Sequence, residues 1–216
     1  MIIQQLINLT RNYIGRDDIK DAIITVPSYF NDSQREAIQM SSKISGINVL
    51  NIVDEEITVC YSYKLHKYGK KKNILVFNMR SNETNVTIIN LQDSIFNIIG
   101  TVKVDNLGGN ILNEELIKYC INEFNEKNGI IIEKDSKGYK RLEEICEKCI
   151  IDLSYSEQCE IDIDELSEGE DLNITIYRFE FEDICKYLFD KIISLIKEVL
   201  EYSYLTKNEI DEIILT

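Results

Sequence analysis

The stretch that most constrains the fold is residues 73–91, NILVFNMRSNETNVTIINL. Its first half begins with a short apolar run over 74–77, which is typical of a strand that is buried on both faces. Its second half, 86–91, is rich in β-branched residues and predicts a return strand. Mainly polar residues, 78–84, separate the two halves. The pattern predicts a β-hairpin that needs other strands and helices to cover it.

The rest of the chain alternates between helix and strand patterns, which indicates an α/β fold. In the first half we expect helices over 2–14, 31–46 and 55–66, strands over 21–27 and 48–53, and a basic turn over 69–72. In the second half we expect strands over 94–104, 159–163, 172–176 and 210–215, and helices over 113–128, 140–153 and 178–204. Gly15 is placed to end the first helix. Asn31 or Asp32 is placed to begin the second, with Glu36 in a capping box.

Composition limits the kinds of partner. The chain has 216 residues and a formal net charge of −14, with a pI of about 4.6. A strong acidic excess disfavours nucleic-acid binding, which normally needs a basic face, and also disfavours binding to anionic membranes. No apolar run approaches the ~18–20 residues of a membrane span, and residues 1–9 make a poor signal peptide. Six scattered cysteines suggest reduced thiols, so we expect a cytoplasmic protein.

Cys146 and Cys149 form a Cys-x-x-Cys pair within an expected helix. Residues three apart share one face of a helix, so a metal or redox role is conceivable. No second pair has ligand spacing, and the single histidine, His66, is far away in the sequence. The pattern therefore favours buried helix residues and predicts no metal site.

Three segments resemble the seventy-kilodalton heat-shock chaperone family. Residues 25–36, TVPSYFNDSQRE, are very similar to that family's signature Val-Pro-Ala-Tyr-Phe-Asn-Asp-Ser-Gln-Arg, and residues 46–50, GINVL, continue the match. Residues 107–109 match the family's Leu-Gly-Gly. The resemblance implies an α/β, actin-like ATPase (ribonuclease-H-like) fold with a smaller α+β upper lobe.

The resemblance also implies a division into lobes. Residues 1–67 would form part of one large lobe, 68–107 with 186–216 would form the second, and 108–185 would form the smaller upper lobe. Only the middle of the family's ATPase domain has a counterpart in these residues, so we expect an incomplete fold. The first phosphate loop, the lobe with the catalytic lysine, the Gly-Gly-Ser-Thr-Arg segment and the substrate-binding domain are unmatched.

The hairpin turn departs from the family pattern. Where the family has Asp-Leu-Gly-Gly-Gly-Thr-Phe-Asp, residues 78–85 read NMRSNETN. In the family the glycines bring backbone N–H groups close to ATP phosphates, and the aspartates act through magnesium and water. Here every glycine is replaced, both aspartates have become asparagines, and Glu83 stands in place of the threonine near the terminal phosphate. The resemblance implies that the hairpin persists without its chemistry.

Other site residues are retained in part. Glu55 matches the glutamate of the family's Asn-Glu-Pro-Thr, so we assign it the catalytic role of arranging water around magnesium. Gly108 and Gly109 are expected near the phosphates, where a Gly-Gly pair alone would indicate only a turn. Glu147 and Ser154 match the adenosine-binding helix. The lysine and arginine of that helix, which flank the nucleoside in the family, have become Ile150 and Ile151.

Two classes of function follow from the resemblance. In the first, the chain is an ATP-binding chaperone domain involved in protein folding, with a degraded site that binds ATP and magnesium weakly or not at all. In the second, it is a non-catalytic relative that binds nucleotide-exchange factors or other chaperones through 108–185. A truncated product without function is a further alternative. Hydrolysis of ATP by this chain alone is not expected, because phosphoryl transfer needs several cooperating groups.

Overall fold

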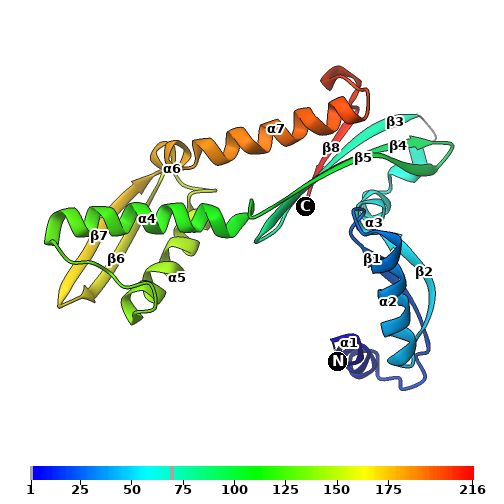
Figure 1. The fold of residues 1–216 in the computed structure, drawn as a ribbon, viewed down its shortest axis with the longest axis horizontal. Helices are drawn as coiled ribbons and strands as arrows, with labels where there is room; N and C mark the ends of the chain where they lie inside the picture. Colours follow the sequence, from blue (N-terminus) through cyan, green and yellow to red (C-terminus); the bar gives the residue numbers. More distant parts are fainter. Residues whose placement is uncertain (1, 69–70) are drawn as a thin grey trace. The chain divides into compact units, whose positions relative to one another are not determined.

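The computed structural model describes residues 2–68 and 71–216 (Figure 1). Its elements are, in order, α1 (Ile2–Ile14), β1 (Asp21–Val26), α2 (Asp32–Ile44), β2 (Asn48–Asp54), α3 (Glu55–Ser62), η1 (Leu65–Tyr68), β3 (Lys72–Met79), β4 (Glu83–Gln92), β5 (Ile95–Asp105), α4 (Gly109–Asn128), α5 (Lys137–Asp152), β6 (Gln158–Ser167), β7 (Glu170–Tyr177), α6 (Arg178–Ile184), α7 (Lys186–Tyr202), η2 (Lys207–Glu209) and β8 (Glu212–Leu215). The chain divides into two compact units. The first contains Met1–Phe77, Val86–Val102 and Glu198–Thr216, and the second contains Asn78–Asn85 and Lys103–Lys197.

In the first unit, β1 and β2 form a parallel pair with α2 packed beside them (Figure 1). The parallel register aligns Asp21 with Asn48 and Val26 with Asp54, with one irregularity after Ala22. α1 ends as expected at Gly15, which takes a left-handed φ of 68° and donates its N–H to the carbonyl oxygen of Arg11 at 2.8 Å.

The hairpin predicted at 73–91 is confirmed as β3 and β4. These strands belong to a four-stranded sheet of order β5-β4-β3-β8, in which β3 and β8 are parallel. Because the sheet is covered, the apolar run of β3 is buried, with Ile74 at 0% and Val76 at 1% exposure. The core of the first unit contains these two residues together with Cys60, Leu65, Ile89, Leu91, Phe96 and Ile214.

The second unit is built on an antiparallel pair, β6 and β7, with α5 against β6 and α4 against α5. α4 buries one apolar face, since Leu116, Ile117 and Phe124 are each at most 2% exposed. None of the helices in the described part of the chain is both long and apolar enough to cross a lipid bilayer.

Four local expectations need correction. The helix expected over 55–66 ends at Ser62, because Lys64 takes a left-handed φ of 59°, and a 3₁₀ turn follows. The helix expected over 178–204 breaks at Cys185, whose φ of −93° and ψ of 3° depart from helical values. The helix expected from 113 begins four residues earlier, at Gly109. Part of the basic turn expected over 69–72 lies outside the described residues.

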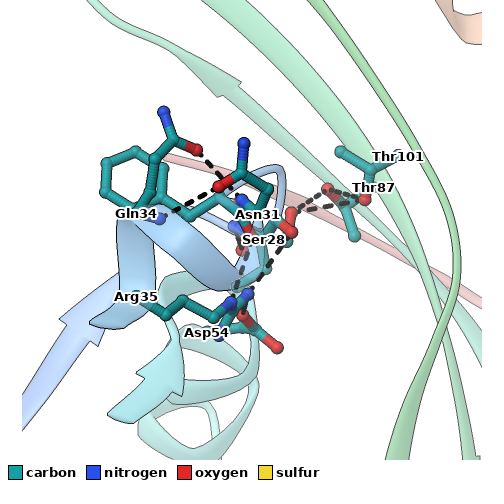
Figure 2. Close-up of polar contacts among 9 residues, drawn as sticks. Ser28, Asn31, Gln34, Arg35, Asp54, Thr87 and Thr101 are labelled. Atoms are coloured by element: carbon teal, nitrogen blue, oxygen red, sulfur yellow. Dashed lines mark hydrogen bonds and ion pairs between the residues drawn. The ribbon is translucent and has the colours of Figure 1, made fainter. Parts of the chain in front are cut away.

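The fourth correction concerns the start of α2. Asn31, one of the two predicted candidates, is the N-cap of α2. Its partner in the capping box is Gln34 and not the predicted Glu36. The Asn31 Oδ1 atom accepts from the Gln34 N–H, and Gln34 Oε1 accepts from the Asn31 N–H, both at 2.9 Å (Figure 2). The reason is geometric, since only the third residue after the cap can reach back to its N–H.

Candidate functional site

The signature segment 25–36 forms the end of β1, the loop between β1 and α2, and the first turn of α2, in the first unit. Figure 2 shows the Ser28 hydroxyl pointing toward the hydroxyls of Thr87 on β4 and Thr101 on β5. The three oxygens lie 3.2–3.4 Å from one another. Thr87 is completely buried, so the two half-buried hydroxyls satisfy a hydroxyl group that has no access to water. The signature loop is thereby tied to the four-stranded sheet.

Two further contacts fix the same loop. The Ser28 N–H donates to the Glu56 carboxylate at 3.2 Å, and Glu56 is only 1% exposed. The Arg35 guanidinium donates to the carbonyl oxygen of Phe30 at 3.0 Å and forms an ion pair with Asp54 (Figure 2). Asp54 and Glu56 flank Glu55 at the junction of β2 and α3. The sequence alone did not reveal these contacts, because their partners lie 19 to 28 positions away.

Glu55 is the first residue of α3 and is half-buried. Its carbonyl oxygen accepts from the Thr58 hydroxyl at 2.6 Å, which fixes the first turn of the helix. The contacts of its two neighbours therefore hold Glu55 at a defined backbone position. Its role with magnesium and water stays a prediction.

In the second unit, the hairpin turn contacts the beginning of α4. The Gly109 N–H donates to the carbonyl oxygen of Arg80 at 2.9 Å, and the Asn110 N–H donates to that of Ser81 at 2.8 Å. The Asn106 N–H donates to the carbonyl oxygen of Asn82 at 2.7 Å. A helix start is usually a ready anion site because its first N–H groups have no intrahelical partner. Here two of those groups already have protein acceptors.

Gly108 makes this close approach possible. A Cβ atom at Gly108 would lie 2.3 Å from the carbonyl oxygen of Arg80 and 2.6 Å from that of Ser81. At Gly109 a Cβ atom would meet nothing within 4 Å. The Gly-Gly pair predicted for phosphate binding therefore has one residue that lets the hairpin turn pack against the chain and one that faces open space.

Glu83, which replaces the family's threonine, is held among cations. Its carboxylate lies 3.0 Å from the Lys103 ammonium and 3.7 Å from the Arg80 guanidinium. The same ammonium lies 2.8 Å from the Asp105 carboxylate. Next in the chain, the buried Thr84 hydroxyl donates to the carbonyl oxygen of Leu107 at 2.5 Å. These contacts give the hairpin turn an internal network of its own.

A cavity of about 680 Å³ opens beside this turn, a volume within the ~300–1,000 Å³ range of small-molecule sites. It brings together Gly109 and Glu147, two of the residues predicted from sequence, with the substituted Ile150 and Ile151. Gly108 lines a separate cavity of about 200 Å³. Ser154 lines neither cavity and donates its hydroxyl to the carbonyl oxygen of Ile150 at 3.4 Å.

The lining of the larger cavity is acidic. Besides Glu147 it contains Glu114, Glu143 and Glu144, all exposed, against one guanidinium from Arg80. Such a lining disfavours a polyphosphate, because like charges repel and no second cation is present among the lining residues. Sequence reasoning missed these three glutamates, although two of them lie in the same matched helix as Glu147.

The Cys-x-x-Cys pair is buried, as predicted, with Cys146 at 0% and Cys149 at 1% exposure. A hydrogen bond with Cys120 and burial raise the pKa of the Cys146 thiol well above its usual range. Burial and a hydrogen bond with Cys159 raise the pKa of Cys149 in the same direction. Both thiols therefore stay protonated, which makes them poor nucleophiles and poor metal ligands.

The family model described as Hsp70 protein matches residues 1–216. The match covers the full sequence, so the chain belongs to the Hsp70 family. Members of this family are chaperones with an actin-like ATPase fold, bind ATP and magnesium, and work with nucleotide-exchange factors and co-chaperones. The family resemblance and the fold class predicted from the sequence are thus confirmed.

Proposed function

We propose that this member of the Hsp70 family retains the fold of the ATP-binding domain with a degraded nucleotide site. On this proposal the chain binds ATP and magnesium weakly or not at all, and does not hydrolyse ATP by itself. Its remnants of the site are Glu55 as the catalytic residue and Gly108, Gly109, Glu147 and Ser154 as the nucleotide-binding residues.

The observation that carries the proposal is the pairing of the Gly109 and Asn110 N–H groups with the Arg80 and Ser81 carbonyl oxygens. An N–H group can donate one good hydrogen bond, so a phosphate at this position would have to displace a protein acceptor. The turn would then leave its own carbonyl oxygens without donors. A phosphate that binds at the start of α4 therefore gains little net free energy, because each new hydrogen bond replaces an existing one.

The cavity beside the turn supports the same proposal. The four glutamates would repel the phosphate chain of ATP, while Ile150 and Ile151 offer apolar contact only. A guanidinium that stacks on a base contributes roughly 1–3 kcal/mol in nucleic-acid complexes. The two isoleucines cannot stack as a guanidinium does, so we expect both the phosphate chain and the adenosine to bind more weakly.

Calorimetry with magnesium–ATP on the folded 216-residue chain tests the proposal. We expect a dissociation constant in the millimolar range or no binding, and phosphate release at the rate of the buffer control. A matched titration with adenosine separates the two halves of the nucleotide, since it lacks the phosphates that the glutamates repel. A micromolar dissociation constant for ATP that persists when Lys20 and Lys43, which line a different cavity, are changed to glutamine would contradict the proposal.

An exposed aromatic pair favours a second candidate function, a non-catalytic interaction module that acts through 108–185. Tyr177 and Phe179 stack with ring centroids 5.7 Å apart, and Phe179 is 67% exposed. Exposed aromatic rings are enriched at protein interfaces. Binding of a purified Hsp70 nucleotide-exchange factor should weaken at least about tenfold in Phe179→Ser if this pair is a contact point. Unchanged binding by the variant, or no binding by the parent chain, would count against this candidate.

The lobe division and the compartment belong to the proposal too. We assign residues 1–67 to one large lobe, 68–107 with 186–216 to the second, and 108–185 to the smaller upper lobe. We place the protein in the cytoplasm, which agrees with the free state of its six cysteines.

A further inference from the structure

We propose that a second cavity, in the first unit, binds the phosphate group of a small molecule. This cavity has a volume of about 620 Å³ and lies between α1, the loop that follows it, α2 and the start of β2. Its lining includes Arg11, Lys20 and Lys43 with a single carboxylate, Asp17. The inference is independent of the nucleotide site proposed above, because no lining residue is shared.

The charge of this cavity contrasts with the charge of the chain. Acidic residues outnumber basic ones by 38 to 24 in the whole sequence, whereas three of the four charged lining residues are cations. Among the described residues, Lys20 and Lys43 have no carboxylate within 4.0 Å of their ammonium groups. The nearby Arg16 and Asp18 neutralise each other at 2.8 Å. Among the described residues, the lining therefore has a local positive excess that Asp17 offsets only in part.

Arg11 supplies a second observation that points to a ligand. One Nη atom of its guanidinium donates to the carbonyl oxygen of Ile19 at 3.1 Å, which holds the side chain in place. Its Nε atom is buried and has no acceptor in the described part of the chain. A buried donor without a partner is costly, and a small shift of the side chain toward an anion in the cavity would give it an acceptor. The guanidinium is thus anchored through one Nη atom, while its Nε–H group is unsatisfied among the described residues.

The chemistry of these groups selects phosphate over a carboxylate. A guanidinium matches the spacing of phosphate oxygens, and two ammonium groups add point charges. With Asp17 subtracted, the lining carries about two positive charges, which suits a phosphate monoester dianion better than a singly charged carboxylate. The amides of Gln39 and Asn48 add polar contacts for the rest of the ligand. The volume fits a small organic phosphate.

Titration of inorganic phosphate and pyrophosphate into the full chain at low salt, followed by calorimetry and by amide NMR shifts, tests the site. We expect saturable binding that weakens as salt rises. The double variant Lys20→Gln with Lys43→Gln should lose at least about tenfold in affinity, as expected when charge-assisted contacts are removed. The matched control is Lys127→Gln, an exposed cation in the second unit and outside the lining, which should bind like the parent chain.

Arg11→Lys separates charge from geometry. It keeps the positive charge and removes the guanidinium, so it should weaken binding while circular dichroism and the unfolding midpoint remain close to those of the parent chain.

Co-sedimentation with vesicles that contain phosphatidic acid, against phosphatidylcholine vesicles, distinguishes a lipid headgroup from a free phosphate as the source. Binding to the acidic vesicles that is lost in the lysine double variant supports the site with a lipid source. No saturable binding of any probe, or equal binding by parent and double variant, overturns the proposal.

Discussion

At the residue scale, two adjacent glycines with opposite surroundings decide how closely the hairpin turn packs. A methyl group at Gly108 would overlap two backbone oxygens, which cannot move away as a flexible side chain could. A methyl group at Gly109 would enter open space at the first position of a helix. The same chemical change at neighbouring positions therefore has opposite consequences.

We expect Gly108→Ala to lower the free energy of unfolding by about 1–3 kcal/mol, the usual cost of forcing extra volume into a packed site. Gly109→Ala is the matched control and should be neutral or stabilising by up to about 1 kcal/mol, because alanine favours the helix. Urea unfolding of both variants measures the difference. Equal stability of the two variants would show that the turn does not pack against Gly108 as described.

A buried thiol predicts a pH dependence. Burial, together with the nearby Glu56 carboxylate, raises the pKa of Cys60 from 9.0 to about 12, against a weaker opposing hydrogen bond from the backbone. The folded state thus holds a proton that the unfolded state releases above pH 9. This stabilisation is complete below pH 9 and is lost as the pH rises from about 9 to about 12.

We expect the free energy of unfolding to fall in that interval by up to about 1.4 kcal/mol per pH unit from this group. Urea unfolding at several pH values between 8 and about 10.5 measures the slope. Cys60→Ala should be less stable at every pH because of the lost packing, but should show a shallower slope. A slope that Cys60→Ala leaves unchanged would assign the effect to other groups.

At the element scale, the start of α2 joins the family signature to the rest of the first unit. Asn31 and Gln34 satisfy each other's backbone N–H groups, and Arg35 pairs with Asp54 one turn later. Both interactions use residues from the matched segment. The segment therefore has a structural role that needs no nucleotide.

The capping box can be tested residue by residue. Asn31→Ala should lower the free energy of unfolding by about 1 kcal/mol, the usual effect of losing an N-cap side chain. Gln34→Ala should cost less, because it removes only the reciprocal bond. Glu36→Ala is the control: this exposed residue takes no part in the box and should stay within about 0.5 kcal/mol of the parent chain. A larger effect at Glu36 than at Gln34 would contradict the assignment.

Hydrophobic periodicity and the residues that end helices predicted the helices and strands, but they did not predict the contacts between those elements. The apolar run of β3, the pair β6–β7 and the left-handed Gly15 follow from local rules, and all three are present. The break at Cys185 carries neither proline nor glycine, so no local signal could show it. The acceptors of the Gly109 and Asn110 N–H groups come from residues nearly thirty positions away, and no sequence pattern specifies such a pairing.

At the scale of the whole molecule, charge is distributed unevenly. The chain has a formal net charge of −14, one cavity lined by four glutamates and another lined by three cations. A polyphosphate such as ATP should therefore prefer the cationic cavity. If the chain binds ATP at all, we therefore expect the binding to occur in the cationic cavity.

We accordingly expect any weak ATP binding to disappear in the double variant Lys20→Gln with Lys43→Gln. Ile150→Lys with Ile151→Arg, which restores the family's cations in the acidic cavity, should instead add affinity for ATP. Calorimetry on the parent chain and both double variants separates the two cavities. ATP binding that persists unchanged in the lysine double variant would place it outside the cationic cavity.

Restoring the family's residues in the hairpin turn tests whether changes in that turn alone prevent ATP hydrolysis. The repaired chain carries glycine at positions 80, 81 and 82 together with Asn78→Asp, the residues that the family pattern has there. Removing the side chains leaves the carbonyl oxygens of positions 80 and 81 in place, so the Gly109 and Asn110 N–H groups keep their present acceptors. The repair also deletes the Arg80 guanidinium, which lies 3.7 Å from the Glu83 carboxylate and is the one cation in the acidic lining.

Glu83 would still oppose a terminal phosphate. Two like charges 4 Å apart repel by about 4 kcal/mol at an effective dielectric constant of 20, and Lys103 at 3.0 Å offsets part of that repulsion. We therefore expect the four-residue variant to release phosphate from ATP at the background rate, and Glu83→Thr added to it to improve binding more than turnover. Steady-state phosphate release and calorimetry on the parent chain and both variants measure the two effects. Robust turnover by the four-residue variant would mean that the turn alone had silenced the site and that neither the occupied N–H groups nor the acidic lining prevents catalysis.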